Sequence, residues 1–117
     1  MRNECLDREL ANLERECAVS KWDGYSSSPL SKRSLVFARK LAEALPEDAR
    51  VPTPLVDRRG NVLFQWGSIR RRYLALTFVA GESEAGVKCK IGNAGVFRTC
   101  ELGCDLERVV TFAKEHL

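Results

Sequence analysis

The spacing of apolar residues predicts two helices in the first part of the chain. The first helix is predicted by apolar residues that recur at steps of three and four among charged neighbours, namely Leu6, Leu10, Leu13 and Cys17. Such a stripe is typical of an amphipathic helix, and this one is predicted to end near Ser20. A second helix is predicted to begin at Ser28-Pro29 or Ser31 and to stop at Pro46, because proline cannot continue a helix. Its buried stripe comprises Leu35, Ala38, Leu41, Ala42 and Leu45.

After Pro46 the apolar period becomes twofold, which is typical of strands. Residues 51–56 contain two prolines, which fit only an edge strand because proline donates no ladder hydrogen bond. Four more strands are predicted as two hairpins, joined around Gly67-Ser68-Ile69 and around residues 92–95. Their ranges are 62–66, 70–79, 87–91 and 96–100.

Asp105 is positioned to cap a final helix in which Leu106, Val109, Val110 and Ala113 form one stripe. The element order is therefore ααβββββα. This order predicts an α+β fold with two layers, in which helices pack on one face of an antiparallel meander of four to five strands. The length of 117 residues fits a single domain spanning residues 1–117.

Loop length decides which side chains share a face of the sheet. Three-residue loops at Gly67 and at Asn93 place the apolar strand residues, with Phe97 among them, on the core face. The opposite face would be basic and would contain a tyrosine. Its predicted members are Gln65, Arg71, Tyr73, Thr77, Lys88, Lys90 and Arg98, of which Arg71, Tyr73, Lys88, Lys90 and Arg98 are the candidate binding residues. The alternative interpretation is an ordinary solvated sheet face.

Composition changes this picture little. The chain is 44% hydrophobic and 30% charged, with a formal net charge of +3, which is too small to indicate nucleic-acid binding by itself. No apolar run is long enough to span a bilayer, and the first residues form a charged amphipathic pattern rather than a signal peptide. A cytoplasmic location without membrane attachment is expected.

The five cysteines are an odd number in a chain with no export signal, so reduced thiols packed as small hydrophobes are expected, with disulfides as the alternative. Zinc needs four ligands, whereas only Cys100 and Cys104 are closely spaced and the single histidine is His116. We therefore expect no metal and no cofactor. We expect His116 to be poorly placed for catalysis because chain ends are usually poorly ordered, and no enzyme activity is predicted.

The most distinctive string is Trp22-Asp23-Gly24-Tyr25 followed by Pro29. It resembles a W-D-G-Y-x-x-x-P junction in a loose group of small, uncharacterised bacterial and phage-associated proteins, and this resemblance implies no activity. From the residues, the string predicts a structural hinge: Trp22 and Tyr25 pack on the helices, Gly24 turns the chain and Asp23 accepts backbone amides. A ligand pocket made by the same residues is the alternative.

Two functions are compatible with these features. The first is a non-catalytic accessory factor that binds a protein partner or forms a homodimer, such as a regulator, inhibitor or antitoxin-like protein, with a mobile element as one source. It uses an exposed strand edge at residues 96–100. The second is a nucleic-acid-binding module that uses the basic sheet face, where cations meet phosphates and the tyrosine stacks on a base.

Overall fold

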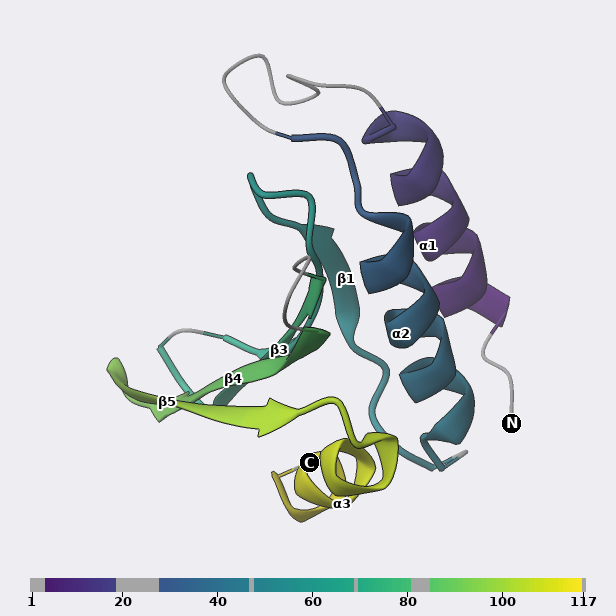
Figure 1. Cartoon of the computed structure of the whole chain (residues 1–117). Coiled ribbons are helices and arrows are strands. Elements are labelled where there is room, and N and C mark those ends of the chain that lie inside the picture. Colours follow the sequence, from purple (N-terminus) through teal and green to yellow (C-terminus); the bar gives the residue numbers. More distant parts are fainter. Residues whose placement is uncertain (1–3, 19–27, 47, 69, 81–84, 117) are drawn as a thin grey trace.

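A computed structural model describes residues 4–18, 28–46, 48–68, 70–80 and 85–116 of the chain. Three helices and five strands follow in the predicted order (Figure 1). The helices are α1 (Glu4–Glu16), α2 (Lys32–Ala44) and α3 (Leu106–His116). The strands are β1 (Thr53–Val56), β2 (Val62–Gly67), β3 (Tyr73–Ala80), β4 (Ala85–Asn93) and β5 (Val96–Gly103). The predicted α+β fold is confirmed.

Local sequence signals fix the helix ends. Ser31 caps α2 by accepting a hydrogen bond from the Ser34 amide at 3.3 Å, and the helix ends just before Pro46. Asp105 caps the start of α3 by accepting from the Glu107 amide at 3.1 Å. Both predicted caps are therefore present.

The strands form one antiparallel sheet in the order β1-β2-β3-β4-β5, so each strand pairs with its neighbours in the sequence. The helices lie on one side of this twisted sheet, with α1 and α2 side by side and α3 near the end of β5 (Figure 1). All three contribute to one hydrophobic cluster with the sheet. The sheet residues at its centre are Val62, Phe64, Trp66, Leu74, Leu76, Phe78, Val87 and Cys89.

The connection between β2 and β3 is longer than predicted. Gly67 pairs with Tyr73, and the Ser68 amide donates to the Arg72 carbonyl at 3.1 Å across the loop between them. Trp66 therefore lies opposite Leu74 rather than opposite Arg70. This shift is an even number of residues, so the predicted core face of β2 and β3 is correct although the loop is not.

Candidate binding surfaces of the sheet

The sheet face turned away from the helices carries most of the polar residues predicted for it. Strand pairing places Lys88 opposite Thr77, and Tyr73 opposite both Gly67 and Gly92, so these side chains share that face. We call this surface the open face. The predicted members that lie on it are Gln65, Tyr73, Thr77, Lys88 and Lys90.

Arg71 does not lie on the open face as a strand residue, which corrects the prediction. The Arg71 amide donates to the Ser68 carbonyl at 3.0 Å, so Arg70, Arg71 and Arg72 belong to the loop before β3. The Arg71 carbonyl also accepts from the Ala94 amide at 3.2 Å, which ties this loop to the β4–β5 turn. The physical cause is the positive φ of 78° at Gly67, which closes β2 early.

The predicted positions of Phe97 and Arg98 are exchanged. Asn93 pairs with Val96, so the β4–β5 loop has two residues, Ala94 and Gly95, rather than three. Their φ values of 54° and 84° are both positive, as the turn of a two-residue hairpin requires. A register change of one residue reverses the faces. Phe97 therefore lies on the open face opposite Gly92, and Arg98 lies on the helix side opposite Ile91.

An aromatic cluster replaces the expected row of cations. The rings of Tyr73 and Phe97 meet edge to face with centroids 5.6 Å apart, and the Lys90 ammonium lies 4.6 Å from the centroid of Phe97. The Phe97 ring covers Gly92 so closely that a Cβ there would come within 2.2 Å of it. Burial raises the pKa of the Tyr73 phenol above its ordinary value.

The open face is less basic than the sequence predicted. With Arg71 and Arg98 elsewhere, its remaining candidate cations are Lys88 and Lys90, and Lys88 lies 3.9 Å from the carboxylate of Glu101.

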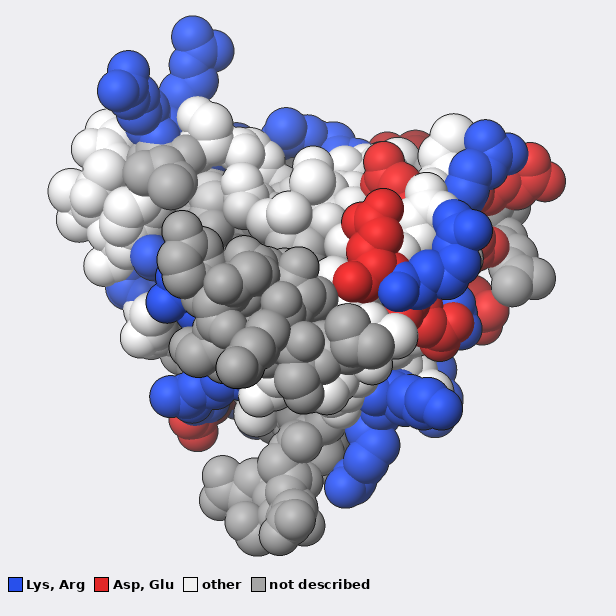
Figure 2. All heavy atoms as spheres, turned by 90° about the horizontal axis from the view of Figure 1, so that it is seen from above, with Lys and Arg blue, Asp and Glu red and all other residues white. Residues whose placement is uncertain are grey.

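Figure 2 shows acidic side chains gathered among basic ones where α1 and α2 lie, on the right of that view. Toward the hairpin ends on the left, basic side chains stand on largely uncharged surface (Figure 2).

The outer edge of β5 is the second candidate surface. In the described part of the chain no strand pairs with this edge, and most β5 side chains are exposed, with Val96 at 76%. The Cα atoms of Cys89 and Cys100 are 5.3 Å apart, the spacing of a pair that exchanges two backbone hydrogen bonds. Since the pattern alternates, Phe97, Thr99 and Glu101 point their amide and carbonyl groups outward.

A groove of about 580 Å³ runs beside this edge, between the end of β5 and one side of α3. Its lining residues include four carboxylates and one arginine among their charged groups, so the groove is acidic. The carboxylates belong to Glu101, Asp105, Glu107 and Glu115, and the arginine is Arg108. The groove therefore offers negative charge next to outward-pointing backbone groups.

The opposite edge of the sheet is protected. β1 has four residues and includes Pro54, which has no amide hydrogen to donate. Helix α1 also lies against β1. Short strands, prolines and covering elements are the usual means by which proteins block strand addition. Of the two edges, that of β5 has no strand paired with it and no proline in the strand, among the described residues.

The cysteines are not all reduced thiols in the structure, which corrects that expectation. Cys89 and Cys100 face each other across β4 and β5 and form a disulfide. Cys5, Cys17 and Cys104 are free, and burial with the neighbouring Glu16 raises the pKa of the Cys17 thiol. The pairing depends on the β4–β5 register, which is why sequence spacing did not indicate it.

The structure describes His116 but not the four residues of the predicted hinge. Trp22, Asp23, Gly24 and Tyr25 lie outside the described residues. His116, expected at a poorly ordered end, lies in the last turn of α3, where its ring stacks on Phe112 with centroids 4.2 Å apart.

Among the described residues, no group of three or more metal-ligating side chains is assembled. None of the described helices is long and apolar enough to cross a membrane.

Comparison of the chain with protein-family models, with curated proteins and with solved structures finds no match.

Proposed function

We propose that the protein is a non-catalytic accessory factor that binds a protein partner by accepting an extended segment of it as an additional strand along β5. The observation that carries this proposal is the outer edge of β5, where Phe97, Thr99 and Glu101 direct backbone groups away from β4. Strand addition of this kind draws its affinity from main-chain hydrogen bonds, and neighbouring side chains provide selectivity.

The acidic groove beside β5 supports a partner segment rich in lysine or arginine. Glu101 lies on β5 itself, while Glu107 and Glu115 project from α3 along the same groove. Complementary charge favours encounter and rejects acidic segments. A regulator or inhibitor that holds a basic peptide is the class of accessory factor that these features suit.

Thr99→Pro is the sharpest test of strand addition. Thr99 directs its amide outward, so proline removes a donor available to a partner without breaking the ladder to β4, and edge strands tolerate proline. Proline at Arg98 would instead break a bond to β4. The matched control is Thr99→Val, which keeps the amide and a β-branched side chain.

The experiment is selection of linear peptides from a random display library with the wild-type protein. Peptides recovered by the wild type should bind Thr99→Val with similar affinity and Thr99→Pro at least tenfold more weakly, because several main-chain hydrogen bonds depend on that register. N-methylation of alternate peptide amides should also weaken binding. Equal binding by folded Thr99→Pro, or recovery of no peptide, contradicts the proposal.

A second candidate function is binding of single-stranded nucleic acid on the open face. The specific observation in its favour is the Tyr73, Phe97 and Lys90 cluster, which combines two aromatic rings with a cation. Oligonucleotide affinity should then fall as salt rises and should drop in Lys90→Glu, while Lys40→Glu on α2 serves as the control. Binding that is absent or insensitive to salt removes this candidate.

The location of the protein stays a prediction. A cytoplasmic protein would keep Cys89 and Cys100 reduced, because thiols are rarely oxidised in that compartment. Strand addition does not require the disulfide, since the β4–β5 ladder itself fixes the edge.

A further inference from the structure

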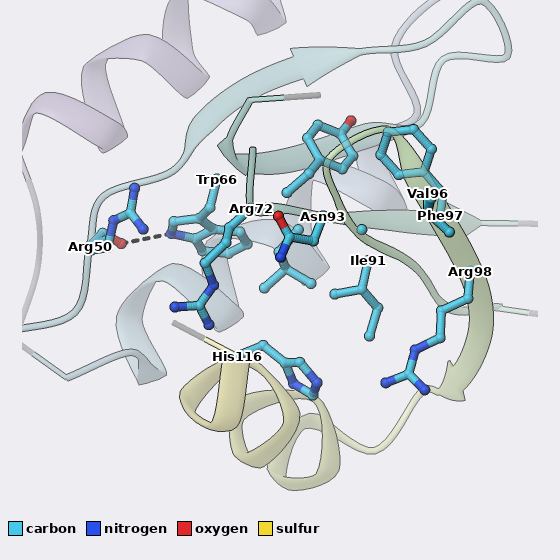
Figure 3. Close-up of a pocket in the computed structure, with 12 residues that line it drawn as sticks. Arg50, Trp66, Arg72, Ile91, Asn93, Val96, Phe97, Arg98 and His116 are labelled. Atoms are coloured by element: carbon cyan, nitrogen blue, oxygen red, sulfur yellow. Dashed lines mark hydrogen bonds between the residues drawn. The ribbon is translucent and has the colours of Figure 1, made fainter. Parts of the chain in front are cut away.

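A pocket lies at one end of the sheet, where β2 and β4 end, β3 and β5 begin, and the last turn of α3 closes one side (Figure 3). Its volume is about 360 Å³, which falls within the size range of small-molecule sites. Val96, Phe97 and Arg98 of β5 contribute to its wall, and Tyr73 and Phe97 also belong to the aromatic cluster of the open face. Thr99 and Glu101 do not line the pocket, so Thr99→Pro tests strand addition without changing a pocket residue.

The pocket is strongly cationic. Arg50, Arg72 and Arg98 line it together with His116, and the described lining residues include no aspartate or glutamate. In Figure 3 the guanidinium groups of Arg72 and Arg98 reach toward the His116 ring from either side. Across the described part of the chain, no ion pair joins these three arginines to a carboxylate.

Arg72 and Arg98 are exposed at the rim of this pocket, and no carboxylate among the described lining residues offsets their charge. An anion bound among them would supply the missing charge. Guanidinium groups also match the geometry of carboxylate and phosphate oxygens, each offering two parallel donors. The charge arrangement thus selects anions.

Much of the remaining wall is apolar, and Tyr73 and Asn93 add polar groups to it. The Trp66 side chain is 4% exposed, and its indole N–H donates to the Arg50 carbonyl at 2.8 Å, so this polar atom needs no partner from a ligand. Leu74 is buried and Ile91 is half-buried beside it. The His116 Nδ1 lies 2.9 Å from the Phe112 carbonyl, a contact that fixes the orientation of the ring at the pocket wall.

We propose that this pocket binds a small organic anion in which a carboxylate or phosphate group is carried on a flat, apolar body. The anionic group lies between Arg72 and Arg98, next to His116, and the apolar body packs toward Trp66 and Ile91. Arg50 lies beyond Trp66, with its carbonyl toward the indole N–H (Figure 3).

The test uses benzoate and phenyl phosphate as anionic probes and benzyl alcohol as the neutral probe of similar shape. Trp22→Phe leaves Trp66 as the remaining tryptophan, so its indole N–H resonance reports binding directly. Both anions should shift this resonance and give saturable heats in calorimetry, and their relative affinities distinguish a carboxylate site from a phosphate site. Benzyl alcohol should give no comparable shift.

Arg72→Gln and Arg98→Gln should each weaken anion binding by about tenfold or more, because each removes a charge-assisted hydrogen-bonding group. Arg33→Gln, which changes an exposed arginine on α2 outside the pocket, should leave the affinity unchanged. The proposal is overturned if neither anion shifts the Trp66 resonance at millimolar concentration. It is also overturned if benzyl alcohol binds as well as benzoate, or if both arginine variants keep full affinity.

Discussion

The Ser34 hydroxyl donates a hydrogen bond to the Phe78 carbonyl at 2.5 Å and accepts one from the Val62 amide at 2.7 Å. Ser34 is buried on α2, whereas Phe78 and Val62 belong to β3 and β2. One side chain therefore joins the helix layer to the backbone of two strands. These two hydrogen bonds hold α2 against the sheet, whose β5 edge is the proposed binding surface.

Ser34→Ala should lower the free energy of unfolding by about 1–3 kcal/mol, because the buried Val62 amide loses its partner. Urea denaturation followed by circular dichroism measures the change. Ser68→Ala, at an exposed turn position, is the control and should stay within about 0.5 kcal/mol of the wild type. Equal stability of Ser34→Ala and the wild type would show that the bridge contributes nothing.

The β4–β5 turn predicts a stabilising substitution. Ala94 has a φ of 54°, a conformation that disfavours residues with a Cβ and that asparagine tolerates better. Ala94→Asn creates the Asn-Gly pair preferred in such turns and should raise stability by about 0.5–1 kcal/mol. Gly95→Ala, at a φ of 84°, should lower it. Thermal denaturation that moves in the opposite directions would refute the two-residue loop.

Thiol chemistry tests the Cys89–Cys100 pairing. Protein purified without reductant should show three reactive thiols after denaturation, belonging to Cys5, Cys17 and Cys104. In the native state the exposed Cys5 and Cys104 should react first, since Cys17 is buried and its thiol has a raised pKa. Five reactive thiols in the denatured, unreduced protein would contradict the disulfide.

Tyr73 should titrate at higher pH than a free tyrosine because burial disfavours the phenolate. The unfolded chain loses this proton first, near pH 10, so the stability held below that pH should decline as pH rises through the raised pKa of the folded state. Tyrosinate absorbance during an alkaline titration reports both tyrosines. Tyr73→Phe should remove a transition that lies above the ordinary tyrosine value; loss of a transition at the ordinary value would contradict the packing of the aromatic cluster.

The fold could be predicted from sequence because the patterns that specify it are local. Ser31 and Pro46 bound α2, and the twofold period of Val62, Phe64 and Trp66 holds whatever the loop length. The even shift in the β2–β3 pairing left this face intact.

The candidate sites depend on single-residue details that the pattern does not contain. Whether residues 92–95 close in two or three residues decides on which face Phe97 and Arg98 lie. The pocket beside His116 depends on α3 packing against the sheet, which brings together residues distant in the sequence. No spacing of residues in the sequence predicts that these side chains line one pocket.

The most direct measurement of the central claim is amide hydrogen exchange by NMR, with and without a peptide selected by the wild-type protein. In the free protein the amides of Phe97, Thr99 and Glu101 should exchange rapidly, while Arg98 and Cys100, bonded to β4, are protected. Peptide binding should protect the first three as well. If these three amides stay unprotected in the complex, the partner does not add as a strand to β5.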